Sequence, residues 1–261
     1  MNKFRQALDF AKYRLKSGNE HSIHSPFVFE LYNDVITDEN PFYIYNDIES
    51  IRAKLLLTDM EVSIEDHGAG STVNPSNKRK IKDIAKHTLK SPKYGQLLFR
   101  LVNRFKPKTI LELGTSLGLS TMYMAAVAKN VNVVTVEGCK NTAKVAQVNF
   151  DKIGFRNITL NNDTFDSFLP DYLKEVDTLD FVFFDGNHTK EATLNYFNLC
   201  VTKANQETVF VFDDIHWSDG MTEAWEIIQQ NEKVTTTIDL HFVGIVFFNP
   251  DLSKEDFLLK F

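Results

Sequence analysis

The stretch that decides the fold runs from Thr109 to Thr121 and reads T-I-L-E-L-G-T-S-L-G-L-S-T. It predicts a short apolar strand at 109–113, then a glycine-rich turn, then a helix that begins at Leu119. In α/β domains, such a turn presents backbone N–H groups at a helix N-terminus to a nucleotide-like ligand. The spacing of Gly114 and Gly118 is G-x-x-x-G, which differs from the G-x-G-x-x-G of dinucleotide-binding turns.

Strand and helix patterns alternate from about residue 92 onward, which indicates a parallel sheet with helices between its strands. The expected strands are 109–113, 132–137, 157–161, 179–185, 208–213, 235–240 and 244–248. The expected helices are 119–129, 141–153, 189–202 and 219–230. The last two strands are joined by only a few residues, so they must pair antiparallel. We therefore predict an α/β fold with a doubly wound, mostly parallel, Rossmann-like sheet of seven strands that ends in an antiparallel hairpin.

The first part of the chain differs in composition from the rest. Residues 1–91 are rich in aromatic side chains and favour helices and irregular loops, so we expect a helical N-terminal cap there and a cofactor-binding core at 92–261. The segment 65–71, E-D-H-G-A-G-S, also looks like a nucleotide turn, but Pro75 interrupts any helix after it. We expect this segment to form a flexible loop that covers the site.

Lysine and arginine are concentrated at 78–93. This stretch predicts an amphipathic helix with a solvated basic face, on which Ile81, Ile84, Ala85 and Leu89 turn inward. The alternative is a basic rim that holds an anionic substrate.

Bulk composition excludes several classes of function. The net charge of −6 is a poor match for a polyanion, so we expect no nucleic-acid partner. No apolar run approaches the ~18 residues that span a bilayer, and the N-terminus lacks a signal-peptide core, so we expect a cytoplasmic protein without a membrane partner.

Cys139 and Cys200 are the only cysteines and predict two buried thiols. The aromatic cap suggests a homodimer.

Acidic residues end or follow four consecutive expected strands. They are Glu137, Asp163, Asp185 and the pair Asp213 and Asp214. Because ligands bind outside the carboxyl ends of the strands in open α/β sheets, this regularity indicates a binding site. The carboxylate of Glu137 can accept hydrogen bonds from both hydroxyls of a ribose, or it is a surface glutamate in a β–α turn. Asp163 is alternatively the N-cap of a helix that begins near Thr164.

Over residues 92–248 the chain resembles the class I S-adenosylmethionine (SAM)-dependent methyltransferases. More narrowly, it is similar to the cation-dependent O-methyltransferases of the catechol and caffeoyl-CoA type and their bacterial relatives. The motifs that carry the resemblance are Y-G-Q-L-L at 94–98, L-E-L-G-T-S-L-G-L-S-T at 111–121, T-V-E at 135–137, L-D-F-V-F-F-D-G-N-H at 179–188 and V-F-D-D-I-H-W at 211–217.

The resemblance implies SAM as the cofactor. The matching cofactor-binding residues are Gly114, Thr115, Ser116, Gly118, Glu137, Asp163 and Asp185. Asp163 stands where a class I methyltransferase commonly contacts the adenine amino group. The implied reaction is direct methyl transfer to an oxygen of a small-molecule acceptor, in which the enzyme mainly orients the reactants.

The resemblance also implies a Mg²⁺ site, because the family holds this ion with an aspartate after the fourth strand and an Asp-Asn pair after the fifth. The matching residues are Asp185, Asp213 and Asp214. Asp214 departs from the family's Asn, and the third carboxylate adds negative charge that a dication tolerates but an empty site resists. The ion would hold a substrate hydroxyl and lower its pKa.

Two histidines are candidates for the catalytic base. His188 occupies the position of the family's catalytic lysine, three residues after Asp185, and His216 lies two residues past Asp214. An imidazole with a pKa near ~6.5 can accept a hydroxyl proton at neutral pH. For each, the alternative is a hydrogen-bonded structural histidine.

Two other functions compete with this interpretation. One is an NAD(P)-linked oxidoreductase, which the glycine spacing and the terminal hairpin disfavour. The other is a non-catalytic SAM-binding module, which the acidic strand ends disfavour.

Overall fold

The protein is described here by a computed structural model that places residues 3–65 and 78–261. Its contacts divide the chain into two compact units. Unit 1 comprises Met1–Asp38 and Tyr172–Phe261, and unit 2 comprises Glu39–Asp171. The boundary expected between residues 91 and 92 stays a prediction. Most of the loop expected at 65–71 lies outside the described residues.

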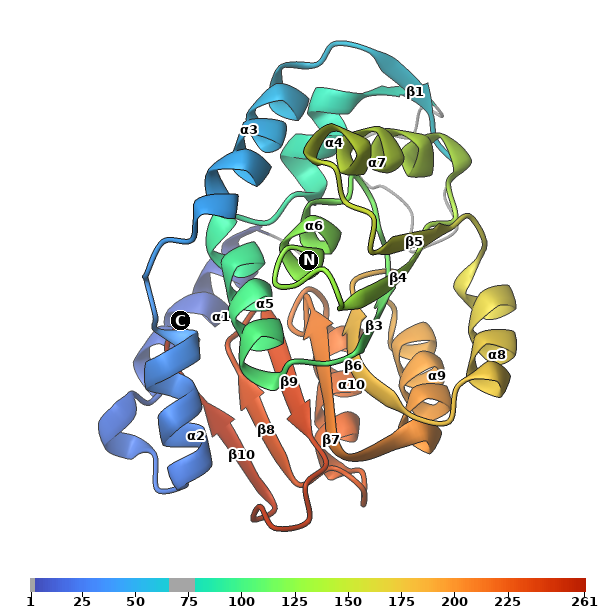
Figure 1. Cartoon of the computed structure of the whole chain (residues 1–261). Helices are drawn as coiled ribbons and strands as arrows, with labels where there is room; N and C mark the ends of the chain where they lie inside the picture. The colour runs from blue at the N-terminus through green and yellow to red at the C-terminus, as the bar shows by residue number, and fades with distance from the viewer. Residues whose placement is uncertain (1–2, 66–77) are drawn as a thin grey trace. The chain divides into compact units, whose positions relative to one another are not determined.

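Unit 2 is built on a parallel ladder of strands (Figure 1). Strand β3 (Thr109–Leu113) pairs with β4 (Asn132–Val136), which pairs in turn with β5 (Ile158–Asn161). Four of the five residues in each of β3 and β4 are buried, as apolar strands covered on both faces should be. The first three expected strands are therefore confirmed to within one residue at their ends.

The helices between these strands are α5 (Pro92–Phe105), α6 (Leu119–Ala125) and α7 (Lys140–Ile153). Helix α6 ends four residues before the expected position, at 125 instead of 129. The side-chain amide of Asn157 donates to the carbonyl oxygens of Ala125, Ala128 and Val131, so it replaces a helical donor at Ala125 and holds the loop that follows α6. Helix α7 ends where expected, because Gly154 adopts a left-handed φ of 92°.

The remainder of unit 2 precedes α5. Helix α3 (Tyr43–Leu57) leads to a short antiparallel pair, β1 (Glu61–Ser63) with β2 (Lys78–Lys80), and then to α4 (Ile81–Thr88). The basic stretch therefore begins as a strand, which the sequence did not predict. Its helical part is amphipathic as predicted: the buried residues of α4 are Ile81, Ile84 and Ala85. They join a core cluster that also holds residues of α3, α5, α6 and α7.

Unit 1 contains a mixed sheet with the strand order β10-β8-β9-β7-β6. Strands β6 (Leu179–Phe184) and β7 (Ala204–Asp213) are parallel, and β9 (Val243–Phe247) is antiparallel to both β7 and β8 (Thr236–Asp239). This confirms the antiparallel hairpin. Strand β10 (Glu255–Leu258) pairs in parallel with β8 and adds a strand to the seven expected. It is short and opens with two acidic residues, a pattern typical of an edge strand and weak as a sequence signal.

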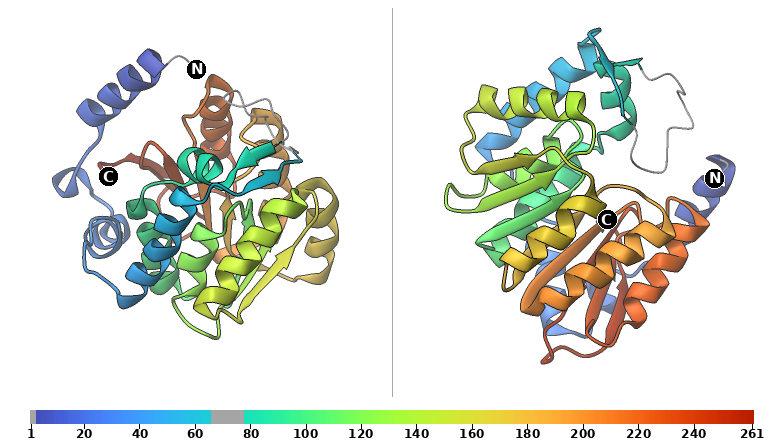
Figure 2. Two further views of the ribbon diagram at one scale, coloured as in Figure 1. Left: turned by 90° about the horizontal axis from the view of Figure 1, so that it is seen from above. Right: turned by 90° about the vertical axis from the view of Figure 1, so that its right-hand side faces the viewer.

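Helices cover both faces of this sheet (Figure 2). Helices α9 (Lys190–Cys200) and α10 (Asp219–Gln230) lie on one face, and α2 (Pro26–Leu31) lies on the other. The ring of Trp225 on α10 lies 6.2 Å from that of Phe212, whereas Phe27 on α2 contacts Phe247 at 5.0 Å. The α/β fold class is thus confirmed.

Within unit 1, the N-terminal helix contacts the last residues of the chain. The N-terminal helix α1 (Lys3–Lys16) precedes a 3-10 turn at Glu20–Ser22, and a π-helical turn at Tyr32–Ile36 follows α2. The hydroxyl of Tyr13 on α1 donates to the carbonyl oxygen of Leu259 at 2.6 Å and accepts from the backbone N–H of Phe261. The boundary between the units falls within α8 (Phe165–Glu175).

Both cysteines are buried and free, as the sequence predicted. Among the described residues, we find no helix with the length and apolar character needed to cross a bilayer.

Two glycines with left-handed backbones give a matched stability test. A Cβ at Gly118 (φ 86°) would clash with the ring of Phe150, whereas a Cβ at Gly154 (φ 92°) would meet no atom within 4 Å. Gly154→Ala should therefore cost only the strain of the left-handed backbone, about 1–2 kcal/mol. Gly118→Ala should cost about 2–5 kcal/mol, because overpacking adds to that strain. Urea unfolding measures both, and equal losses would contradict the clash.

Candidate functional site

A buried carboxylate organises the start of the glycine-rich turn. Glu112 lies in β3 and has no exposed surface. Its carboxylate accepts hydrogen bonds from the hydroxyls of Ser120 and Thr121 on α6 and of Thr135 on β4. Burial raises the pKa of Glu112, and the three hydroxyl donors oppose this effect. Glu112 therefore holds the two strands and the first turn of α6 in a fixed arrangement around the glycine-rich turn.

The glycine-rich turn is tied to the end of β4 by Glu137. One carboxylate oxygen of Glu137 accepts the backbone N–H of Ser116 at 2.8 Å, and the other accepts that of Cys139 at 2.9 Å. Glu137 is partly exposed, so its carboxylate is also accessible from outside. The structure thus brings the glycine-rich turn and Glu137 together, as the strand-end argument predicted.

The N–H groups of the turn already have acceptors inside the protein. Those of Gly114 and Thr115 donate to the carbonyl oxygen of Val136, and that of Gly118 donates to the carbonyl oxygen of Thr115. The buried hydroxyl of Thr115 pairs with that of Thr135 at 2.6 Å. We therefore expect Glu137, more than these N–H groups, to provide the polar contacts to a ligand.

Asp163 follows β5 and is exposed. It accepts the backbone N–H of Thr164, but the hydroxyl of Thr164 accepts the N–H of Ser167 and caps α8. The alternative interpretation of Asp163 as the N-cap is therefore wrong, because the helix begins one residue later than that role requires. Its proposed contact with adenine stays a prediction.

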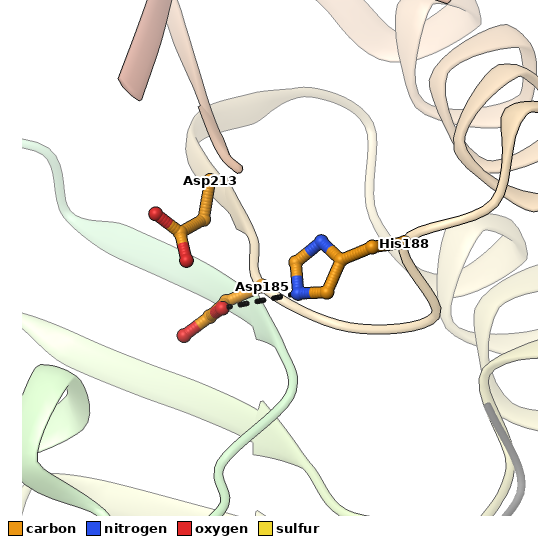
Figure 3. A group of neighbouring side chains, drawn as sticks. All are labelled: Asp185, His188 and Asp213. Atoms are coloured by element: carbon orange, nitrogen blue, oxygen red, sulfur yellow. Dashed lines mark ion pairs between the residues drawn. The ribbon is translucent and has the colours of Figure 1, made fainter. Parts of the chain in front are cut away.

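A second group of candidate residues lies in unit 1. Strands β6 and β7 are parallel, and Phe184 pairs with Phe212 in their register. The next residues, Asp185 and Asp213, therefore emerge at neighbouring strand ends. Figure 3 shows that His188 points toward Asp185, with Asp213 close by.

The side chains of Asp185, His188 and Asp213 converge on one point. One possible ligand atom from each lies within 4.8 Å of the other two. The imidazole Nε2 of His188 is 3.7 Å from Oδ1 of Asp185, beyond hydrogen-bonding distance. Asp213 is only 3% exposed, while the side chains of Asp185 and His188 are 23% and 24% exposed.

The loop after β6 directs His188 back toward Asp185. Asn187 adopts a left-handed φ of 51°, and its carbonyl oxygen accepts the N–H of Thr189 at 2.6 Å. The side chain of Thr189 then caps α9 by accepting the N–H of Ala192. Sequence spacing alone does not reveal this reversal of the chain.

The carboxylate of Asp214 is absent from the group of converging ligand atoms found among the described residues. Asp214 has a left-handed φ of 54°, and its N–H donates to the carbonyl oxygen of Phe242 at 2.7 Å. Among the described residues, the converging group contains Asp185 and Asp213 of the predicted metal ligands together with His188. The metal-binding roles predicted for Asp185, Asp213 and Asp214 stay predictions.

The contacts of His216 fit the alternative interpretation, in which it is a hydrogen-bonded structural histidine and not a catalytic base. Its Nε2 lies 2.7 Å from Oδ2 of Asp239, and its Nδ1 lies 3.1 Å from the hydroxyl of Thr222. Asp239 also accepts the backbone N–H of His241, so this group fixes the loop between β8 and β9. Both ring nitrogens of His216 are engaged, which favours His188 over His216 as a group that acts on a substrate.

Sequence reasoning did not single out Glu112. A signal was present, because a charged residue interrupts the apolar strand T-I-L-E-L and a buried charge requires partners. Its hydroxyl donors lie 8, 9 and 23 residues away, so only the folded chain identifies them.

The chain is similar in sequence to known methyltransferases. Residues 111–215 match the model of a family described as a methyltransferase domain. Over 128 residues, the chain is 32% identical to a catechol O-methyltransferase from Niastella koreensis. This alignment covers 48% of the chain and 57% of that relative, so the chain spans little more than half of the relative's length.

Solved structures share the fold. An O-methyltransferase from Bacillus cereus in complex with SAH is 19% identical, with a TM-score of 0.56 over 85% of this chain and 97% of that chain. The O-methyltransferase TomG from Streptomyces achromogenes, in complex with SAM, is 20% identical, with a TM-score of 0.55 over 62% of this chain and 82% of that chain. The chain therefore has the α/β fold of these proteins.

The buried carboxyl group of Glu112 gives a pH test. The pKa of Glu112 in the folded protein is raised above the ordinary value of 4.5. Glu112 therefore makes its full contribution to the free energy of unfolding below pH 4.5, and this contribution is lost as the pH rises through the folded-state pKa. Glu112→Gln cannot ionise. The free energy of unfolding of this variant, relative to wild type, should therefore increase between about pH 5 and about pH 8. Urea unfolding at both pH values measures the change, with Glu207→Gln on the surface as the control. If the difference in unfolding free energy between Glu112→Gln and wild type did not vary with pH, the raised pKa of Glu112 would be contradicted.

Proposed function

We propose, from the match of residues 111–215 to the model of the methyltransferase-domain family, that this chain is a SAM-dependent methyltransferase which transfers a methyl group to an oxygen of a small molecule. The observation that carries the proposal is the pairing of Glu137 with the glycine-rich turn through the N–H of Ser116. The name of the 32% identical relative, a catechol O-methyltransferase, supports oxygen as the accepting atom.

The cofactor would lie against the glycine-rich turn of unit 2. Glu137 is well suited to bind a ribose, because a carboxylate accepts two hydrogen bonds and its charge strengthens both. Its position does not depend on the ligand, since Ser116 and Cys139 already hold it. The Glu112 network keeps the turn itself in place. When bound, SAM supplies an activated methyl group, and the protein's contribution is to orient it and exclude water.

The acceptor would lose its proton at the group of Asp185, His188 and Asp213 in unit 1. The two carboxylates are hard oxygen ligands, so this group suits a divalent cation. A bound cation would supply a Lewis acid that lowers the pKa of an acceptor hydroxyl. His188 can accept a proton or bind the cation, and its Nε2 cannot do both at once.

Several features of the proposal concern location and assembly. A cytoplasmic location, a homodimer, and the absence of nucleic-acid and membrane partners all stay predictions. The proposed acceptor is a small molecule that carries a hydroxyl group.

The activity is tested directly with SAM that carries a labelled methyl group. Incubation with a panel of phenols and other hydroxyl compounds, with and without a divalent cation, should give a labelled product and S-adenosylhomocysteine in equal amounts. Calorimetric binding of NAD⁺ without binding of SAM would contradict the proposal and favour an oxidoreductase. Binding of SAM with no labelled product from any acceptor would favour a non-catalytic SAM-binding module.

Removal of the Glu137 carboxylate should weaken SAM binding at least tenfold. Glu137→Ala deletes charge-assisted hydrogen bonds worth about 1.5–3 kcal/mol. Calorimetric titration with SAM measures the loss, with Glu207→Ala on the surface as the matched control and circular dichroism as the check on folding. An affinity equal to that of wild type would remove Glu137 from the cofactor site.

A further inference from the structure

We infer that His188 is a ligand of a divalent transition-metal ion, together with Asp185 and Asp213, and that this group selects Mn²⁺ or Co²⁺ over Mg²⁺. The inference rests on the proposed function only for the part that the ion plays in methyl transfer. The binding of the ion follows from the side chains themselves.

The geometry of the group fits one ion. Ligand atoms that each lie about 2.1 Å from one ion are separated by roughly 3–4.2 Å, depending on the coordination angle. Nε2 of His188 and Oδ1 of Asp185 are 3.7 Å apart, which is within this range and too long for a hydrogen bond. The full set, with all three atoms within 4.8 Å of one another, requires only a small contraction.

The backbone fixes each of the three side chains. Asp213 ends β7 in register with Val243 of β9, and Asp185 directly follows β6. His188 lies between the left-handed Asn187 and the helix cap Thr189. A site on such fixed elements loses little conformational entropy when it binds an ion.

The chemistry of the donors decides which ion fits. Mg²⁺ prefers oxygen ligands in a near-ideal octahedron and keeps several waters. An imidazole nitrogen instead favours first-row transition ions, for which affinity rises from Mn²⁺ through Fe²⁺ and Co²⁺. A third carboxylate from Asp214 would have favoured Mg²⁺, but its side chain is not part of the converging group within residues 78–261. The substitution of nitrogen for oxygen therefore shifts the preference away from Mg²⁺.

Coordination also assigns a role to His188. A nitrogen that binds an ion has no lone pair for a proton, so Nε2 of His188 is not the general base when the ion is bound. His188 would act instead by holding the ion, and a bound ion would lower the pKa of the acceptor hydroxyl so that its proton is released to water.

The test measures ion binding without any methyl transfer. The whole chain is stripped of metal and titrated calorimetrically with Mg²⁺, Mn²⁺ and Co²⁺ in separate experiments. Pulsed electron paramagnetic resonance of the Mn²⁺ complex reports whether an imidazole nitrogen is coordinated. The variants are His188→Ala and His188→Asn, and the matched control is His24→Asn, which changes an exposed histidine of unit 1.

We expect Mn²⁺ and Co²⁺ to bind at least tenfold more tightly than Mg²⁺, and the Mn²⁺ complex to show coupling to ¹⁴N. Both His188 variants should lose this coupling and at least tenfold of the Co²⁺ affinity, while their Mg²⁺ affinity should change less than threefold. The control should behave as wild type. Equal affinity for Mg²⁺ and Co²⁺, or a Mn²⁺ complex without nitrogen coupling, would overturn the inference. A protonated His188 that pairs with the two carboxylates would give the second of these results.

The outcome separates this inference from the proposed function. Nitrogen coupling in a chain that methylates no acceptor would support the metal site and contradict the methyltransferase. If labelled product formed undiminished after chelation and the Mn²⁺ complex showed no nitrogen coupling, the methyltransferase would be supported and the metal site would be contradicted.

Discussion

The burial of the Glu112 carboxylate constrains much of what surrounds the glycine-rich turn. A carboxyl group with no exposed surface is costly unless its oxygens have donors, and the three hydroxyls that satisfy it come from α6 and β4. These donors can reach Glu112 only if β3, the turn and the first turn of α6 take one relative position. The turn that presents Ser116 to Glu137 is a consequence of that position.

The common edge at which parallel strands end brings candidate site residues together in both units. Neighbouring parallel strands end at the same edge, so residues just past them become neighbours in space. In unit 2, this property joins the turn after β3 to Glu137 after β4. In unit 1, it joins Asp185 after β6 to Asp213 at the end of β7. Within each unit, the register of that unit's own strands therefore sets which acidic side chains become neighbours.

The two candidate histidines show how local backbone assigns chemistry. His188 and His216 are each close to an acidic strand end in sequence, and for each of them the sequence leaves open a catalytic or a structural role. The left-handed Asn187 turns His188 toward two carboxylates at a strand edge, whereas His216 is held between Asp239 and Thr222. The first arrangement suits an ion or a proton, and the second fixes a loop.

The sequence by itself determined the α/β class, the order of the strands from β3 to β9, the antiparallel hairpin and the proximity of Glu137 to the glycine-rich turn. These features depend on short-range periodicity and on the common edge of parallel strands, both of which are legible along the chain. Only the tertiary structure decided that the imidazole of His188 lies beside Asp185 and Asp213, that Glu112 is satisfied by distant hydroxyls, and that β10 extends the sheet. These features depend on side-chain direction and on contacts between residues far apart in sequence, and neither residue type nor spacing encodes them.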